Sequence, residues 1–385
     1  MKHIVIISSN YPSKAHPNYG IFVQQLVRAF ARIDIKCKVI SPMSTFDIRY
    51  GKLDPVRTYD YTINENPIEI IRPRYISFSN KQILSFNTVR LTQITFEQAV
   101  YKALLYLNPS PDILYGHFLY PSGAAALHLA HNLGIPSFVA FGEDSFWSVA
   151  PFGFKKAVSD FRSVSGIVSV SSLNEKKLVA RLKIPRRKIG VFPNGVDLSL
   201  FYPRNRQKMR KKYGYPLDKF IIAFTGYFNE VKGPHRVLKA VSQIENIDIG
   251  LIFMGSGDIV LESEKILFKG IVKHSIVPEM FSAADIFVLP TLSEGSCNSI
   301  IEALACGLPI VSSKDEFNDD IIDNEIAIKV NPRNITQIRD AIIKLATDKN
   351  IYEEMSSKAL EKSKKFDINL RAKKIIEWIN FIINN

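Results

Sequence analysis

The chain has 385 residues, 46% of them hydrophobic, and a formal net charge of +13. This length predicts two or three domains with buried cores, and no apolar stretch reaches the roughly 18 to 20 residues that cross a bilayer. The three cysteines, Cys37, Cys297 and Cys306, have neither metal-site nor disulfide spacing, so we expect no metal and a reducing, cytoplasmic location.

The positive charge is concentrated in the first half of the chain. Residues 1–203 contain 24 Lys and Arg against 13 Asp and Glu, which gives a net charge of +11. Residues 204–385 contain 26 Lys and Arg against 24 Asp and Glu, which gives a net charge of +2. A basic surface favours an anionic membrane or a phosphate-bearing acceptor, although it also simply keeps a protein in solution. The sequence carries no RNA- or DNA-binding motif, so we expect no nucleic-acid partner.

In the first half, short apolar runs alternate with helical patterns. Strands are expected at residues 4–8, 37–41, 68–72, 112–115, 136–141, 166–169 and 189–192. Helices are expected at residues 22–32, 93–107, 122–133 and 174–182. Short apolar strands that alternate with helices indicate an α/β fold with a parallel sheet covered on both faces.

A polar, basic segment at residues 203–215 marks the expected domain boundary, and a second alternating series follows it. Strands are expected at residues 220–224, 248–254, 266–269, 286–289 and 309–312. Helices are expected at residues 235–242, 277–283, 299–306, 336–346, 351–364 and 370–383. We therefore expect an N-terminal domain over 1–203 and a C-terminal domain over 204–365, with a final helix at about 366–385 that packs back on the first.

Two parallel-sheet domains also predict where ligands bind. In open α/β sheets, ligands bind outside the carboxyl ends of the strands. We expect the two sheets to face each other with these ends, so that the active site lies in a central cleft between the domains.

Residues 290–309 have the clearest chemical pattern, because they lead from a strand through a glycine-containing loop into a helix. We expect Ser296 or Asn298 to cap this helix, and the amide groups at its start to bind a phosphate or a carboxylate. Glu294 and Glu302 would repel such an anion unless they bind hydroxyl groups, which a sugar and a ribose provide. On spacing alone, a capped helix with two solvated glutamates explains the pattern equally well.

The spacing of Glu294 and Glu302, with seven residues between them, resembles the paired-glutamate motif of the family 4 retaining glycosyltransferases. This is the glycogen-synthase-like group with the GT-B fold. The sequences Ser293-Glu294-Gly295 and Glu302-Ala-Leu-Ala-Cys306-Gly307-Leu-Pro309 are similar to the family, as is the preceding segment 281–290. The resemblance implies two Rossmann-like parallel-sheet domains and a retaining hexosyltransferase.

The segment 224–233 resembles the strand and loop that hold the donor diphosphate in this family. Lys232 is the matching lysine, a point charge suited to phosphate, although a surface lysine before a helix is the alternative explanation. Gly226 belongs to the same loop. Tyr227 departs from the family, since many members carry arginine there; without that guanidinium, Lys232 carries more of the leaving-group charge or another cation shares it.

Two further segments resemble loops of the donor domain. Gly255 lies in a short glycine-rich turn, and Val272 lies in residues 270–278, whose backbone holds the nucleotide base in the family. We expect His274, in the same segment, to be a surface residue. The resemblance thus assigns donor binding to Gly20, Gly226, Tyr227, Gly255, Val272, Gly295, Ser296, Cys297, Asn298, Ser299 and Glu302.

Three segments of the first domain resemble family loops near the transferred sugar and the acceptor. Gly20 ends the loop at residues 12–20 and lets the backbone approach the donor closely. His117 matches a histidine near the transferred sugar, with a buried structural histidine as the alternative. In Phe141-Gly142-Glu143-Asp144, Phe141 replaces a family histidine, and Asp144 is the candidate for orienting an acceptor hydroxyl.

The resemblance implies sugar transfer with retention of the anomeric configuration and without a metal or cofactor. Lys232, Tyr227 and the helix amides would stabilise the charge that develops on the departing diphosphate. Glu294 would hold sugar hydroxyls, and a phosphate oxygen would help to deprotonate the acceptor. The expected catalytic residues are Glu294, Lys232 and His117. We expect a UDP-sugar donor, with GDP-sugar as the rival, and a lipid-linked or growing surface glycan as the acceptor.

Two other functions stay open at this point. A nucleotide-sugar epimerase of the same fold would keep its sugar and release no glycosylated acceptor. A non-catalytic partner subunit of a glycosyltransferase would bind the nucleotide-sugar without turnover, and the departures at Tyr227 and Phe141 are compatible with that role.

The basic first domain offers a surface for an anionic membrane, which would place the protein at the inner face of the membrane. An acidic glycan would explain the charge equally well. The residues expected on this surface are Arg72, Arg74, Lys81, Tyr75, Phe78 and Phe86.

Overall fold

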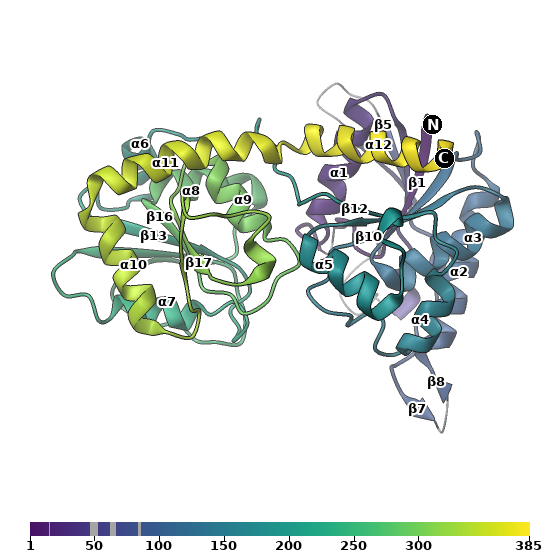
Figure 1. Cartoon of the computed structure of the whole chain (residues 1–385), viewed down its shortest axis with the longest axis horizontal. Coiled ribbons are helices and arrows are strands. Elements are labelled where there is room, and N and C mark those ends of the chain that lie inside the picture. Colours follow the sequence, from purple (N-terminus) through teal and green to yellow (C-terminus); the bar gives the residue numbers. More distant parts are fainter. Residues whose placement is uncertain (15, 47–52, 62–66, 84–85) are drawn as a thin grey trace. The chain divides into compact units, whose positions relative to one another are not determined.

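The computed structural model describes residues 1–14, 16–46, 53–61, 67–83 and 86–385, which divide into two compact units (Figure 1). Unit 1 comprises Met1–Pro193 and Ile368–Asn385, and unit 2 comprises Asn194–Asp367. Residues 194–203, which we expected in the first domain, therefore belong to unit 2. Their attachment has a clear cause, since Phe201 is fully buried in the core of unit 2 and the Val196 amide donates to the Phe366 carbonyl (2.8 Å).

Unit 1 contains an eight-stranded sheet with the order β12-β11-β10-β9-β1-β2-β5-β4. All neighbours are parallel except β4 and β5, which are antiparallel. Its strands are β1 (His3–Ile7), β2 (Lys36–Ile40), β4 (Arg57–Tyr61), β5 (Pro67–Ile71), β9 (Ile113–His117), β10 (Ser137–Phe141), β11 (Gly166–Ser169) and β12 (Ile189–Val191). Four short strands form two separate pairs: β3 (Met43–Ser44) with β6 (Arg74–Tyr75), and β7 (Gln82–Ile83) with β8 (Phe86–Asn87).

Helices cover both faces of this sheet, because successive strand residues point to opposite sides. Ile4 and Ile6 pack with α1 and α12, whereas Val5 and Ile7 pack with α2 and α3. The helices of unit 1 are α1 (Ile21–Arg32), α2 (Val89–Leu105), α3 (Ala124–Leu133), α4 (Phe154–Phe161), α5 (Ser172–Lys177) and α12 (Ile368–Asn384). The C-terminal helix α12 packs against α1 and places the Trp378 ring against Gly166 and Gly190, where a Cβ atom would lie within 2.8 Å of that ring.

Unit 2 contains a six-stranded, wholly parallel sheet with the order β15-β14-β13-β16-β17-β18. Its strands are β13 (Phe220–Thr225), β14 (Ile249–Met254), β15 (Ile266–Gly270), β16 (Ile286–Leu289), β17 (Ile310–Ser313) and β18 (Ala327–Val330). Its helices are α6 (Arg206–Tyr213), α7 (Pro234–Val241), α8 (Val277–Ala283), α9 (Asn298–Ala305), α10 (Ile335–Thr347) and α11 (Lys349–Ser363).

The chain reverses its direction across the unit 2 sheet between β13 and β16. From β13 the chain proceeds outward to β14 and β15, and it then returns to the other side of β13 for β16, β17 and β18. The connections that leave the carboxyl ends of β13 and β16 therefore diverge. In open α/β sheets, the crevice at which ligands bind lies at such a reversal.

A polar network joins α2, α3 and α4 on one side of unit 1. His128 Nδ1 lies 3.0 Å from a carboxylate oxygen of Glu97, and the Tyr120 hydroxyl donates to Asp160 (2.6 Å). The hydrogen bond to Glu97 is the largest of the influences that raise the pKa of His128 above its ordinary value of 6.5.

We predict that His128 makes the stability of unit 1 depend on pH. Because the pKa of His128 is raised by folding, its protonated ring stabilises the fold at low pH, and this contribution disappears as the pH rises through the folded-state pKa. His128→Gln should lower the free energy of unfolding more at pH 5.5 than at pH 8, by less than about 1 kcal/mol since the ring is partly exposed. Urea unfolding of both proteins at the two pH values measures this, and an equal loss at both would contradict it.

Candidate functional site

Lys232 and Glu294 meet at the crevice between β13 and β16. Lys232 lies in the loop that joins β13 to α7, and Glu294 lies in the loop that joins β16 to α9. The Lys232 ammonium and the Glu294 carboxylate form an ion pair. The Asn229 side chain fixes the first loop, because its oxygen accepts a hydrogen bond from the Lys232 amide (2.9 Å). The structure thus brings together two of the predicted catalytic residues from separate loops.

The start of α9 differs from our prediction. The residue before the helix is Cys297, and within the described part of the chain no side-chain hydrogen bond caps it, so the predicted caps Ser296 and Asn298 are wrong. The reason is a tertiary contact with Asn194. The Ser296 hydroxyl accepts a hydrogen bond from the Asn194 backbone amide (3.2 Å), and the Ser296 carbonyl accepts one from the Asn194 side-chain amide (3.3 Å). The positive end of the helix dipole is therefore left for another negative group.

Glu302 projects from α9 toward a histidine from the loop after β15. His274 Nε2 lies 2.8 Å from a Glu302 carboxylate oxygen, and the imidazole packs against the Phe201 ring at 5.1 Å. His274, expected to be a surface residue, is partly buried, with its side chain 22% exposed. Burial lowers the pKa of His274, but the hydrogen bond and the charge of Glu302 together outweigh burial, so the pKa is raised.

Glycines bring the ends of the three adjacent strands β13, β14 and β15 close together. A Cβ atom on Gly255 would lie 1.9 Å from the Gly226 carbonyl oxygen. The Gly226 amide donates to the Met254 carbonyl (3.1 Å), and the Gly255 amide donates to the Gly270 carbonyl (2.8 Å). Val272 follows in the loop after β15. Gly255 is thus needed for the close packing of these backbone segments.

Tyr227 has a partner of its own. Its side chain is half exposed, and its hydroxyl donates to a carboxylate oxygen of Asp258 (3.2 Å). The charge of Asp258 and this hydrogen bond raise the pKa of Tyr227. Tyr227 is therefore neutral at physiological pH and provides no cation at the position where arginine was expected.

In unit 1, His117 is the last residue of β9 and thus lies at the carboxyl edge of the sheet. Its imidazole is buried against the rings of Phe22 (5.4 Å) and Phe118 (5.0 Å), and its Nδ1 has no hydrogen-bond partner among the residues described. Burial, and to a smaller extent the charge of Arg371, lower the pKa of His117 to about 3. The ring is therefore neutral at physiological pH.

Gly20 is required at the start of α1. It adopts a left-handed conformation (φ 77°), and a Cβ atom there would lie 2.4 Å from the Asn10 carbonyl oxygen. A side chain at this position would displace the loop that follows β1. The structure thus explains the glycine by close packing of two backbone segments.

Asp144 lies in the loop after β10, where the ammonium of Lys177 donates to its backbone carbonyl (2.6 Å). Its neighbour Glu143, which sequence reasoning missed, is buried and accepts hydrogen bonds from the Ser148 hydroxyl (2.7 Å) and the Leu119 amide (3.4 Å). Burial raises the pKa of Glu143 to about 7. No pattern in the sequence separates the inward Glu143 from the adjacent, half-buried Asp144.

Phe141 occupies a core position. Its ring is fully buried and stacks on Phe146 at 5.2 Å. Phe141 is the last residue of β10, but its side chain points into an apolar cluster. The replacement of the family histidine by Phe141 therefore adds to the core of unit 1.

The predicted membrane-facing patch is wrong for Arg72. This residue is buried, and its guanidinium donates to Asp54 (3.1 Å) and to the Pro12 carbonyl (2.6 Å). Arg74 is partly buried and donates to the Asp54 carbonyl. Lys81 and Phe78 are exposed, whereas the side chain of Phe86 lies outside the described residues.

Two family models match consecutive parts of the chain. "Glycosyltransferase Family 4" matches residues 20–200, and "Glycosyl transferases group 1" matches residues 205–362. The chain belongs to the family 4 glycosyltransferases. This assignment agrees with the resemblance found in the sequence.

Relatives and solved structures support the family and its GT-B fold. A Bacillus subtilis protein named as a teichuronic acid biosynthesis glycosyltransferase, TuaC, is 27% identical over 351 residues, which cover 88% of each chain. Sucrose-phosphate synthase from Thermosynechococcus elongatus superimposes with a TM-score of 0.80 at 17% identity, over 100% of both chains. Anabaena HepE in complex with UDP-glucose superimposes with a TM-score of 0.74 at 16% identity, over 99% of this chain and 100% of that one. The expected GT-B fold class with two Rossmann-like domains is confirmed.

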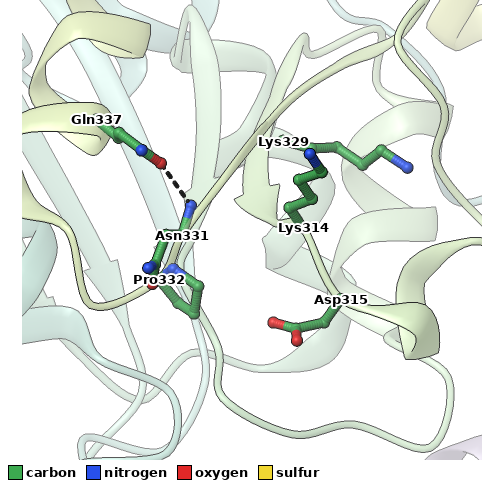
Figure 2. A pocket seen from close by; sticks show the side chains of 6 residues that line it. All are labelled: Lys314, Asp315, Lys329, Asn331, Pro332 and Gln337. Atoms are coloured by element: carbon green, nitrogen blue, oxygen red, sulfur yellow. Dashed lines mark hydrogen bonds between the residues drawn. The ribbon is translucent and has the colours of Figure 1, made fainter.

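A second hollow lies at the same edge of the unit 2 sheet, beyond β17 and β18 (Figure 2). It has a volume of about 560 Å³ and contains the side chains of Lys314, Asp315, Lys329, Asn331, Pro332 and Gln337. None of the site residues expected from the family lines it.

Within the described residues, this glycosyltransferase shows neither a cluster of metal ligands nor a membrane-spanning helix. In that part of the chain, no group of three or more His, Cys, Asp or Glu side chains is placed to hold a metal ion. Nor is any of its helices both long enough and apolar enough to span a membrane.

We predict that Glu294 competes with a bound diphosphate for Lys232. Glu294→Gln removes a negative charge beside the lysine, so inorganic pyrophosphate should bind roughly three- to tenfold more tightly, whereas Lys232→Met should weaken binding by a similar factor. Calorimetric titration of the unliganded protein measures both. Asp248→Asn is the matched control, because it removes a carboxylate paired with Lys219 at the opposite edge of the same sheet. Tighter binding in the control as well would contradict a local effect.

Proposed function

We propose that this family 4 glycosyltransferase transfers a hexose from a nucleotide-sugar, a UDP-sugar in the first instance, to a lipid-linked or polysaccharide acceptor with retention of configuration. The observation that carries the proposal is the Lys232–Glu294 ion pair at the crevice of the unit 2 sheet, beside a helix start without a side-chain cap. A cation and a helix dipole favour a diphosphate, and carboxylates favour hydroxyl groups.

In this proposal, unit 2 binds the donor. Lys232 and the first amides of α9 hold the diphosphate and stabilise the charge that develops on it as the glycosidic bond breaks. Glu294 binds sugar hydroxyls, and Glu302, oriented by His274, binds the ribose hydroxyls. The glycines Gly226, Gly255 and Gly295 allow the backbone to approach, and the backbone around Val272 contacts the base. The residues Ser296, Cys297, Asn298 and Ser299 present the helix start.

Unit 1 contributes to the sugar and the acceptor. A neutral His117 can form a hydrogen bond with a hydroxyl of the transferred sugar, but its low pKa makes it unsuitable as a cationic acid near neutral pH. Asp144 orients the acceptor hydroxyl, and Gly20 lets the N-terminal loop lie close to the donor. We assign proton removal from the acceptor to an oxygen of the departing diphosphate. Since Lys232 and the helix amides provide the positive charge, the proposal includes no metal or cofactor.

The known proteins guide the choice of substrates. The HepE structure contains UDP-glucose, which supports UDP-sugars as the first donors to test. The name of TuaC refers to a wall polysaccharide, which supports a glycan acceptor. An epimerase of the same fold and a non-catalytic partner subunit are the alternatives, and each predicts a different product pattern.

We predict that the purified protein releases nucleoside diphosphate from one UDP- or GDP-sugar, and that membrane lipid extract stimulates the release. Lys232→Ala should lower this rate at least roughly 100-fold, because it removes a charge that stabilises the leaving group. Lys219→Ala, which removes a lysine from the opposite edge of the same sheet, should leave the rate within about twofold. Nucleotide binding without turnover would favour a partner subunit, and sugar interconversion without a glycosylated product would favour an epimerase.

We also propose that unit 1 docks on an anionic membrane surface from the cytoplasmic side through helix α2. Three large apolar side chains, Ile94 (51% exposed), Tyr101 (44%) and Leu105 (61%), share one face of α2, since they are separated by seven and four residues. Lys102 flanks them and is exposed. Exposed apolar side chains beside a lysine favour contact with an anionic membrane interface.

We predict that the protein cosediments with phosphatidylglycerol vesicles and much less with phosphatidylcholine vesicles. The double variant Tyr101→Glu and Leu105→Glu should lower the partition coefficient at least roughly tenfold, because it removes apolar contact and adds negative charge. Leu217→Glu with Val260→Glu is the control, since it alters exposed apolar residues of unit 2. An equal loss in the control would contradict docking through α2.

A further inference from the structure

Arg236 is a buried arginine directly behind the loop that carries Lys232. It lies in the first turn of α7 and is only 4% exposed. Its guanidinium donates to the Glu230 carboxylate (2.7 Å), the Pro290 carbonyl (2.9 Å) and the Val231 carbonyl (3.3 Å). One side chain thus contacts both loops that border the crevice.

The local backbone is shaped to admit this guanidinium. Gly233 adopts a left-handed conformation (φ 69°), and a Cβ atom there would lie 2.1 Å from a terminal nitrogen of Arg236. A side chain at position 233 would therefore expel the guanidinium. The glycine that follows Lys232 is needed for the packing of Arg236 as well as for the turn.

Arg236 acts on the part of each loop that positions a site residue. The Val231 carbonyl accepts hydrogen bonds from both the Arg236 guanidinium and the Leu292 amide (2.8 Å). Lys232 follows Val231 directly, and Glu294 lies two residues after Leu292. The two residues of the ion pair are therefore held by one set of hydrogen bonds centred on the guanidinium.

Burying the Arg236 guanidinium has a large desolvation cost, which would be unnecessary if the side chain only filled space. The partner Glu230 is largely exposed, and Arg236 Nε has no hydrogen-bond partner among the described residues. Burial of the guanidinium lowers the pKa of Arg236. A methionine or leucine would fill the same space without this desolvation, but it would provide none of the directed hydrogen bonds to the two loops.

We propose that Arg236 is a positioning residue that holds the β13–α7 and β16–α9 loops in register, so that Lys232 and Glu294 meet a nucleotide diphosphate together. The inference rests on the proposed function of the site, but the register of the two loops is measurable without a substrate.

Arg210 provides a matched control within the same unit. It is also 4% exposed, and its guanidinium donates to Asp285 (2.6 Å) and to the carbonyls of Ala283 (2.9 Å) and Leu217 (2.8 Å). These partners lie near the amino ends of the unit 2 strands, at the edge opposite to Lys232. Loss of either arginine removes a buried guanidinium, but only Arg236 contacts the crevice loops.

The test compares Arg236→Met with Arg210→Met in the full-length protein. We expect both to unfold at lower temperature, but only Arg236→Met to weaken UDP and pyrophosphate binding, roughly tenfold, in calorimetric titration below both melting temperatures. Hydrogen exchange of residues 226–233 and 290–297, the Leu292 amide included, should accelerate at least roughly fivefold in Arg236→Met alone. Arg236→Lys keeps the charge but lacks the several N–H donors of the guanidinium. It should weaken binding and accelerate exchange in the same loops to a smaller extent, and it replaces Arg236→Met in the test if that variant does not fold.

The outcomes separate the two proposals. Unchanged exchange in both loops, or the same acceleration in Arg210→Met, would overturn the positioning role of Arg236 whatever the protein binds. Absence of UDP and pyrophosphate binding in the unaltered protein would overturn the proposed donor site, while the exchange comparison would still decide the role of Arg236.

Discussion

The reversal of the chain across the unit 2 sheet is the constraint on which the site depends. Parallel strands place all their carboxyl ends at one edge, and the reversal between β13 and β16 makes the two adjacent connections diverge. Two loops that are far apart in the sequence meet at this point, as the Lys232–Glu294 ion pair shows. Lys232 and Glu294, separated by 62 residues, form their ion pair because of this topology.

The charges at this edge are balanced in pairs. Glu294 is paired with Lys232, Glu302 with His274, and the buried Arg236 with Glu230. Glu294 and Glu302, whose side chains are 12% and 13% exposed, therefore avoid unpaired burial, and so does the guanidinium of Arg236. Because α9 starts without a side-chain cap, the helix adds a positive potential that no residue of its own neutralises. The site is thus electrostatically prepared for an anion that also carries hydroxyl groups.

The sequence predicted the α/β class and most strands, because these depend on local periodicity. The choice of Glu294 and Glu302 came from the family resemblance, since their spacing alone fits two solvated glutamates equally well. The sequence missed β4, β18, the four two-residue strands and helix α4. β4 is an edge strand with an exposed face, and β18 has the sequence Ala-Ile-Lys-Val, in which a lysine interrupts the apolar run. The sequence assigned the wrong caps to α9, because Ser296 is engaged by Asn194, 102 residues away. The roles of Glu143, His274 and Arg236 could not be predicted either, because each depends on a tertiary contact that leaves no pattern in the chain.

The two departures from the family acquire different meanings in the structure. Phe141 is a core residue, and its ring adds apolar contact where the family has an imidazole. Tyr227 leaves the β13–α7 loop without a guanidinium at that position, so in the proposed mechanism Lys232 has a larger share in stabilising the leaving diphosphate. A single ammonium on a flexible stem stabilises a diphosphate only if the backbone around it is fixed, since a displaced point charge quickly loses interaction energy. In our proposal, the buried guanidinium of Arg236 fixes this backbone through its hydrogen bonds to the two loops. The chain thus retains a guanidinium at this site, in a structural rather than a direct role.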